Sequence, residues 1–189
     1  MTVHICEAII TLSVFAVFAA ITADFINYDK KTDVKKSRRS FVATGSMFGF
    51  YAVYYIVLRL GLGSLNLLNT PAIIAGTAAI AAGAAMNISG RLSLKGNWAN
   101  HIKIYGDHKL VNRGVYKFIR HPLYASIMLM LSGGSLAYRN WLSAALTAFV
   151  FIPFMYYRAR QEEALLIAEL PGYGEYMRIT GMFFPKLRG

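Results

Sequence analysis

Two short stretches of this chain carry most of the side chains that could do chemistry. The first runs from residue 108 to residue 124 and contains His-Lys-Leu-Val, Gly-Val-Tyr and Arg-His-Pro-Leu-Tyr. The second is Arg-Ala-Arg-Gln-Glu-Glu, at residues 158–163. The first stretch leads directly into an apolar segment long enough to cross a bilayer, and the second follows the next such segment. Ionisable groups beside membrane spans are costly, so these residues are functional candidates.

Each of these side chains also has an ordinary structural explanation. Arg120 precedes an apolar run and could anchor lipid headgroups, and His121 could cap a helix. Arg158 and Glu162 are four residues apart, which is the spacing of a surface ion pair on a helix. Glu163 could simply be solvated. Taken one at a time, the structural explanations are favoured, and only the combination of residues shifts the balance towards function.

Glu163 is the residue for which the structural explanation is weakest. A helix predicted over residues 158–170 places Glu163 on the same face as Ile167 and Leu170. A carboxylate on the apolar face of a membrane-adjacent helix costs free energy unless it is paired. A cationic ligand or a basic side chain would offset that cost. The polar side chains that flank the loop of the first stretch are His108, Tyr116 and His121.

The elements that must position these residues follow from the composition. Hydrophobic residues make up 56% of the 189 residues, more than a soluble domain of this length needs. Five apolar runs have the length of a membrane-spanning helix: Ala8–Ile26, Phe41–Gly61, Pro71–Ser89, Pro122–Tyr138 and Trp141–Tyr157. Backbone groups in lipid must bond internally and the strand alternation of outer-membrane proteins is absent, so the runs predict helices.

The predicted fold class is therefore all-α, a polytopic membrane bundle of about five transmembrane helices in one domain over residues 1–189. Residues 1–89 form three amino-terminal spans, and residues 90–189 hold the candidate residues around a helical hairpin at 122–157. Pro71 and Pro122 begin helices, and Pro153 should kink the last run. The third run repeats small residues that favour close helix packing in lipid, so we expect it to be buried. These small residues are Ala75, Ala79 and Gly83.

The distribution of charge predicts an orientation in the membrane. The formal net charge is +11, and all but two of the 20 basic residues lie in the connections after runs one and three or after run five. The other two, Arg59 and Arg139, lie at the opposite ends of the helices. This asymmetry predicts an amino terminus outside and a carboxyl terminus in the cytoplasm, together with the candidate residues. The cluster from Lys30 to Arg39 could also contact anionic headgroups, and no aromatic-interleaved basic motif suggests nucleic-acid binding.

The two stretches together resemble the isoprenylcysteine carboxyl methyltransferases and their prokaryotic relatives. The wider group includes phospholipid N-methyltransferases. The resemblance covers residues 97–186, and the pairing of Arg-His-Pro with Glu-Glu in a multi-span protein is its most specific part. It also includes Asn97-Trp98, the segment from Gly174 to Tyr176, and Phe184-Pro185. The first three spans carry no motif, and the five-span archaeal-type members look most similar in layout.

The resemblance implies a cofactor, S-adenosylmethionine, bound beneath the bilayer surface by a cytoplasmic connecting loop and the last helices. It implies that Arg158 faces the methyl acceptor and forms the catalytic set with Glu162 and Glu163. The residues implied to bind the cofactor are Lys103, His108, Lys109, Leu110, Val111, Gly114, Tyr116, Arg120, His121, Pro122, Tyr124, Glu162 and Glu163. No Gly-rich dinucleotide fingerprint occurs, so the soluble methyltransferase fold is not expected.

The methyl acceptor implied by the resemblance is the carboxylate of an isoprenylcysteine-like, lipophilic molecule that enters from the bilayer. A carboxylate is already ionised at pH 7, so its methylation needs no general base. The amine of a phospholipid headgroup, or a thiol, would need one, and His121 or a glutamate would be the candidate. A headgroup N-methyltransferase and a non-catalytic membrane subunit therefore remain alternatives.

Two other classes fit the sequence poorly. A transporter would carry polar residues near the middle of its spans, which are apolar here. A metal site would need a cluster of closely spaced ligands, and the four histidines form no such cluster in the sequence. We expect membrane lipids as partners, and neither metal nor nucleic acid.

Overall fold

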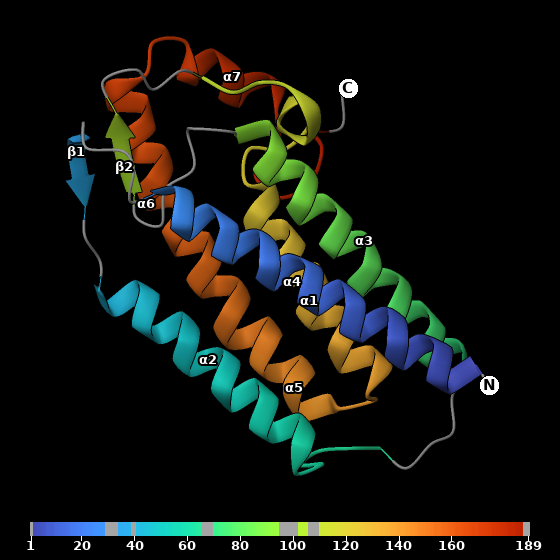
Figure 1. Ribbon diagram of the computed structural model, residues 1–189. Coiled ribbons are helices and arrows are strands. Elements are labelled where there is room, and N and C mark those ends of the chain that lie inside the picture. The colour runs from blue at the N-terminus through green and yellow to red at the C-terminus, as the bar shows by residue number, and fades with distance from the viewer. Residues whose placement is uncertain are drawn as a thin grey trace.

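The computed structural model describes residues 2–28, 34–38, 41–65, 70–94, 102–105 and 110–186. Most of these residues form helices that lie alongside one another (Figure 1), which confirms the predicted all-α bundle. The helices are α1 (Thr2–Tyr28), α2 (Phe41–Arg59), α3 (Thr70–Leu94), η2 (Gly114–Lys117), α4 (Pro122–Ala137), α5 (Trp141–Leu146), η3 (Thr147–Phe151), α6 (Ile152–Glu169) and α7 (Tyr173–Ile179).

Three of the described helical segments are long and apolar enough to cross a membrane: Thr2–Asp24, Thr70–Leu94 and Trp141–Glu169. Pro122–Ala137 is apolar but shorter. Only 11% of the first segment is buried within the protein, so most of its apolar surface must be covered by something else. Lipid provides that cover, which supports an integral membrane protein. The number of spans, five, remains a prediction.

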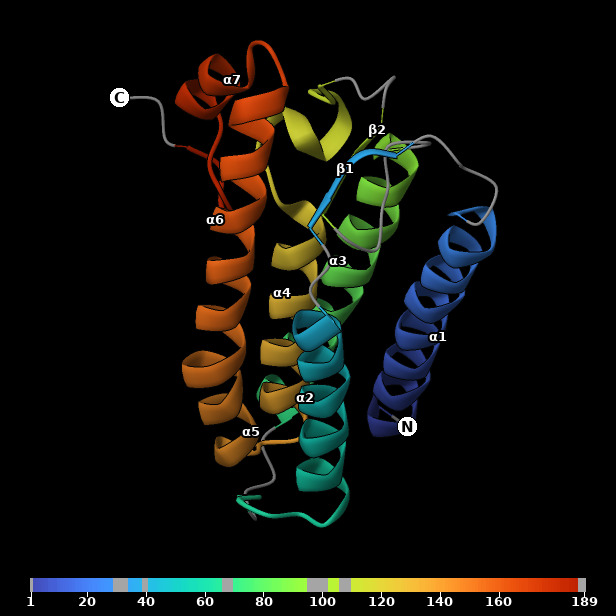
Figure 2. The same cartoon turned by 90° about the vertical axis from the view of Figure 1, so that its left-hand side faces the viewer.

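The two ends of the bundle differ. α7 and two short strands, β1 (Val34–Arg38) and β2 (Ile102–Tyr105), lie at one end, here called the site end (Figure 2). The turn between α4 and α5 lies at the other, here called the hairpin end. The strands pair antiparallel, with Ser37 opposite Lys103. The sequence predicted a basic connection here and no strand, because pairing between segments so far apart leaves little local signal.

α3 and α4 form the closest helix contact. A β-carbon on Gly76 would lie 2.4 Å from the backbone nitrogen of Ala137, and one on Gly133 would lie 2.7 Å from the carbonyl oxygen of Gly76. The helices can approach this closely only because both positions are glycine. Gly83 is buried as predicted, but Ala75 is exposed. The face of α3 that packs therefore includes Gly83 but begins at Gly76 and not at Ala75.

A chain of polar side chains joins three helices near the site end. Arg91 on α3 pairs with Asp24 on α1 at 2.5 Å, and its Nε donates to Oδ1 of Asn87 at 2.8 Å. The Nδ2 of Asn87 donates to Ser126 Oγ at 2.7 Å, and Ser126 Oγ donates to the carbonyl of Leu123 at 2.7 Å. Asn87 and Ser126 are fully buried. This hydrogen-bond network therefore links α1 and α3 to the first turns of α4.

The hairpin end is held by backbone and side-chain caps. At the opposite, site end of α4, His121 precedes the helix and Pro122 begins it, as predicted. The turn after α4 passes through Arg139, which has a positive φ of 50°. The side chain of Asn140 accepts from the backbone N–H of Ser143 at 2.8 Å and so caps α5. Where the sequence predicted a kink at Pro153, the structure has a π-helical turn, η3, just before it.

Candidate active site

The buried carboxylate of Glu163 is the centre of the candidate site. Its side chain is 2% exposed, and its Oε1 accepts a hydrogen bond from Arg120 Nε at 2.7 Å. His121 Nε2 lies 3.3 Å from the same oxygen. Basic side chains therefore offset the cost of burying this carboxylate, which is one of the two possibilities that the sequence left open. The contact joins α6 to the residues that precede α4.

Arg120 also binds the carboxyl-terminal segment of the chain. Its Nη1 donates to the carbonyl of Met177 at 3.2 Å and to that of Thr180. The backbone N–H groups of Arg120 and His121 donate to the carbonyls of Gly181 (2.9 Å) and Met182 (3.0 Å). We call residues 180–184 the strap, because they run beside residues 118–121 and hold them through main-chain bonds. Arg120 therefore has a fixed structural position, whatever its contact with lipid.

Glu162 lies beside Glu163 but is more open. Its side chain is 32% exposed, and its Oε2 accepts a hydrogen bond from the phenol of Tyr124 at 3.0 Å. The rings of Tyr124 and His121 stack with centroids 5.5 Å apart and an interplanar angle of 5°. His121 Nδ1 lies 3.7 Å from Glu162 Oε2, so the histidine stands between the two carboxylates. His121 is at the N-cap position of α4, but its side chain makes no capping bond.

Arg158 is a buried cation with unused donors. Its side chain lies on α6, the residue is 8% exposed, and its Nε and Nη1 have no hydrogen-bond partner among the described residues. The surface ion pair with Glu162 that its spacing allowed is not formed: Glu162 is bound by Tyr124 instead. A buried guanidinium with free N–H groups is costly unless a ligand takes them up. The geometry therefore favours a binding role for Arg158 over a surface one.

Three tyrosines near the carboxylates remain protonated phenols at neutral pH. Burial, reinforced by the charge of Glu162, raises the pKa of Tyr116 well above its usual range. Burial and the nearby charges of Glu163 and Glu162 raise the pKa of Tyr173. Burial raises the pKa of Tyr176 to about 12, while the charge of Arg120 opposes that rise. These groups can donate hydrogen bonds, as Tyr176 does to the carbonyl of Tyr116 at 2.5 Å, but they cannot act as bases.

The remaining predicted residues lie near this centre or outside the described residues. Leu110 packs against the cluster of Leu170, Tyr173 and Tyr176. Val111 is half-buried, and Gly114 begins η2 with a positive φ of 58°. Pro122 is fully buried. The residues that fall outside the described residues are His108 and Lys109, and for Lys103 only the backbone, in β2, is described.

The helix face that the sequence interpretation assigned to Glu163, Ile167 and Leu170 is only partly buried. Ile167, one turn after Glu163 on α6, is 53% exposed, and Leu170 is buried but lies just beyond the end of α6. Sequence reasoning also missed Phe183, whose ring lies 6.0 Å from that of His121, and Thr180, whose carbonyl binds Arg120. No motif marks these two residues, because one acts through its backbone and the other through packing.

The fold and this site together define a class: an integral membrane helical bundle with a buried cluster of arginine, histidine and glutamate at one end. The profile of the isoprenylcysteine carboxyl methyltransferase (ICMT) family matches residues 73–168, just over half of the chain. The chain belongs to this family. The matched segment contains α4, the site residues on α6 and most of α3, but not α1 or α2.

Three curated relatives are similar over part of the chain. The protein-S-isoprenylcysteine O-methyltransferase of Schizosaccharomyces pombe is 34% identical over 62 residues, which is 33% of this chain and 26% of the relative. The cobalt-zinc-cadmium resistance protein CzcN of Cupriavidus metallidurans is 32% identical over 81 residues, 43% of this chain and 38% of the relative. The nickel-cobalt-cadmium resistance protein NccN of Alcaligenes xylosoxydans xylosoxydans is 33% identical over 79 residues (42% and 37%). The chain thus spans less than two fifths of each relative's length.

Proposed function

We propose that this protein is a membrane methyltransferase that transfers the methyl group of S-adenosylmethionine to the carboxylate of a lipophilic, isoprenylcysteine-like acceptor. The observation that carries the proposal is the pair of opposite charges on α6. Arg158 is a buried cation with unused donors, and Glu162 is a partly open carboxylate one helical turn away. Family membership supplies the reaction class. One relative is named for this reaction, and two are named for metal resistance.

The carboxylates suit the polar groups of S-adenosylmethionine. Its ammonium, ribose hydroxyls and adenine amine are hydrogen-bond donors, and its sulfonium is cationic. Glu163 Oε2 is buried and accepts no hydrogen bond from the described residues, and Glu162 remains about one-third exposed beside it. Among the described residues, no group of three or more His, Cys, Asp or Glu side chains is placed to hold a metal ion. These residues therefore fit the proposed cofactor, and nothing in their arrangement calls for a metal.

The roles of the protein's own residues follow from their positions. When bound, S-adenosylmethionine supplies an electrophilic methyl carbon on a cationic sulfur, so transfer to an ionised carboxylate needs no base. Glu162, fixed by Tyr124, would hold cofactor donors, and Arg158 would hold the acceptor's carboxylate through its free N–H groups. Tyr116 stays protonated and cannot compete as a nucleophile. Alignment of donor and acceptor contributes up to about 7–11 kcal/mol in favourable cases, so positioning is the main task of these residues.

The acceptor would reach Arg158 from the lipid. Arg158 lies on the helical segment Trp141–Glu169, which is long and apolar enough to cross a membrane, so an acceptor held there could keep its tail in the bilayer. A lipid tail contributes roughly 0.8 kcal/mol per buried methylene, which favours prenyl or acyl acceptors over small soluble acids.

Labelled-product analysis tests this function. Membranes that contain the protein are incubated with methyl-labelled S-adenosylmethionine and either a prenylcysteine analogue or phospholipid. We expect base-labile methyl ester on the prenylcysteine analogue. Base-stable methylamine on phospholipid would instead establish the headgroup N-methyltransferase, and absence of both, in a preparation that binds no cofactor, would leave the non-catalytic subunit as the better description.

Arg158 and the acceptor's tail give a sharper prediction. We expect the prenylcysteine analogue to be methylated far faster than the same headgroup without its tail. Arg158→Ala should reduce turnover at least tenfold while cofactor affinity stays nearly unchanged, since about 1.5–3 kcal/mol of charge-assisted binding to the acceptor is lost. Arg178→Ala, which removes an exposed arginine at the same end, is the matched control. Normal turnover in Arg158→Ala would remove this residue from the site, and equal rates with and without the tail would reject entry from the lipid.

A further inference from the structure

A pocket lies at the hairpin end, away from the candidate active site. Its volume is about 360 Å³, within the range of small-molecule sites. Tyr124 in the candidate active site lies in the first turn of α4, and Arg139 follows the last turn. The thirteen helical steps from Tyr124 to Ala137 alone span roughly 20 Å at the usual rise per residue. The residues that line it are Leu65, Ala72, Ser132, Ser135, Leu136, Arg139, Asn140, Trp141, Ala144, Thr147, Ala148 and Ile152.

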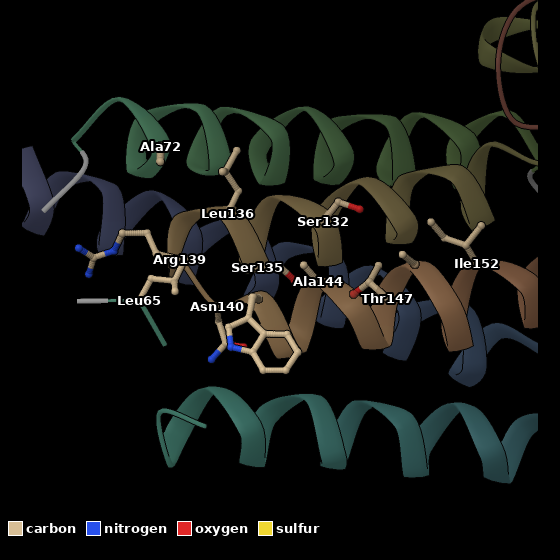
Figure 3. Close-up of a pocket in the computed structure, with 12 residues that line it drawn as sticks. Leu65, Ala72, Ser132, Ser135, Leu136, Arg139, Asn140, Ala144, Thr147 and Ile152 are labelled. Carbon is tan, nitrogen blue, oxygen red and sulfur yellow. The ribbon is translucent and has the colours of Figure 1, made fainter. Parts of the chain in front are cut away.

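The shape of this pocket is that of a groove along the helices. Figure 3 shows Arg139 at one end of the lining residues and Ile152 at the other, with Ser132, Ala144 and Thr147 between them. Ser132 and Ala144 are exposed, so the groove opens sideways to the surroundings of the bundle. Small side chains leave a depression on this face of the bundle. In a membrane, lipid would cover this face.

Three of the polar side chains that line the groove, those of Ser135, Asn140 and Thr147, are already bonded within the protein. Thr147 Oγ1 donates to the carbonyl of Ser143 at 2.8 Å, and Ser143 Oγ donates to Ser135 Oγ at 2.9 Å. Asn140 Nδ2 donates to the carbonyl of Leu62 at 2.9 Å. The walls therefore have few hydrogen-bonding groups left for a sugar or a nucleotide. They suit a hydrocarbon chain, which needs none.

The mouth of the groove is cationic and lies at the level of interfacial aromatic residues. Arg139 occupies a left-handed backbone position, φ 50°, where Gly or Asn is the usual residue. Its backbone is fixed there by bonds from Leu65 N–H to its carbonyl (2.9 Å) and from its N–H to the carbonyl of Leu136 (3.0 Å). Tyr138 and Trp141 beside it are 46% and 57% exposed, as expected at a membrane interface.

We propose that this groove binds one anionic glycerophospholipid, with its phosphate at Arg139 and an acyl chain along the groove towards Ile152. A cation above an apolar groove complements a phosphodiester above a hydrocarbon chain. The lipid would lie in the leaflet away from the candidate active site. The proposal does not depend on the methyltransferase function, because none of its residues belongs to that site.

The test compares lipids on the purified full chain in mixed micelles. Phosphatidylglycerol, phosphatidylcholine and soluble glycerol 3-phosphate are titrated, and bound lipid is counted by native mass spectrometry alongside the shift in Tm. Arg139→Asn keeps a residue that tolerates the left-handed backbone but removes the charge. Ala148→Phe fills the groove. Arg59→Gln removes an exposed cation at the same end that does not line the groove.

We expect the wild-type protein to prefer phosphatidylglycerol and Arg139→Asn to bind it about fivefold more weakly, losing that preference. Ala148→Phe should weaken binding of both lipids, Arg59→Gln should retain the preference, and glycerol 3-phosphate alone should bind negligibly. The proposal is overturned if Arg139→Asn keeps the preference, if Arg59→Gln loses it equally, or if Ala148→Phe binds lipid normally. Tight binding of glycerol 3-phosphate would overturn the acyl-chain part.

Discussion

Glu162 and Glu163 are adjacent in the sequence but have different surroundings. Glu163 is almost completely buried and bonds to Arg120 and His121, whereas Glu162 is about one-third exposed and bonds to Tyr124. The sequence could not say which of the two carboxylates meets the cofactor. The burial of Glu163 suits a residue that fixes the site, and the exposure of Glu162 suits one that binds a ligand.

This difference predicts opposite phenotypes for two matched substitutions. Glu162→Gln should weaken S-adenosylmethionine binding by about 1.5–3 kcal/mol with little change in Tm, because it removes a charged acceptor at the proposed cofactor site. Glu163→Gln should lower Tm clearly, because it leaves Arg120 buried beside a neutral amide. Calorimetry and thermal unfolding in detergent measure the two effects. Loss of cofactor affinity in Glu163→Gln with unchanged Tm would reverse the assignment.

Tyr176 predicts a pH dependence of stability. Its pKa is about 12 in the folded protein and about 10 when unfolded. The phenol therefore loses its proton first in the unfolded state, so its contribution is complete below pH 10 and is lost as the pH rises towards 12. We expect Tm to fall over this interval and to fall less steeply in Tyr176→Phe. Parallel curves for the two proteins would show that Tyr176 does not contribute to this alkaline loss.

Much of the site was predictable at the scale of residues because charge near a span is rare. Arg120, His121 and Glu163 stood out for that reason, and the structure brings them within hydrogen-bond distance. Thr180 was not predictable, because it contributes a carbonyl that every residue has. Phe183 was not either, because an aromatic side chain in an apolar sequence carries no distinguishing signal.

At the scale of elements, the strap of residues 180–184 makes one glycine critical. A β-carbon on Gly181 would lie 1.7 Å from the carbonyl oxygen of Phe184, closer than any contact allows. Gly181→Ala should therefore displace the strap, free Arg120 and His121 from their main-chain bonds, and reduce cofactor affinity and Tm together. Gly174→Ala is the control, because a β-carbon there meets nothing within 4 Å. Wild-type behaviour of Gly181→Ala would mean that the strap does not position the site.

The elements differ in how far they could be predicted. Helices were readable because an apolar run in lipid has few alternatives. The β1–β2 pair was not, since its strands are short, basic and separated by two helices. The π-helical turn before Pro153 was predicted as a kink. A proline indicates that the hydrogen bonds of a helix are disturbed, but it does not indicate which irregular turn results.

The orientation of the whole molecule is a prediction that rests on its charge asymmetry. With Cys6 replaced by alanine, a cysteine at position 30 should react with impermeant reagents only from the cytoplasmic side, and one at position 59 only from the outside. Labelling in intact cells and inverted vesicles measures this. The reverse pattern would contradict the proposed topology and place the candidate site outside the cell. Arg139, the other basic residue at the hairpin end, would then face the cytoplasm.

The position of the strap also has a consequence for biosynthesis. Helices α1 to α6 precede residues 180–184 in the chain, so the spans can enter the membrane before the strap exists. Since synthesis runs at about 5–20 residues per second, a nascent chain passes through a state with its helices inserted and its Arg120 and His121 not yet held by the carbonyls of 180–182. We expect chains cut short before residue 180 to insert into the membrane but to lack the proposed activity. We therefore expect activity to require synthesis at least as far as the strap.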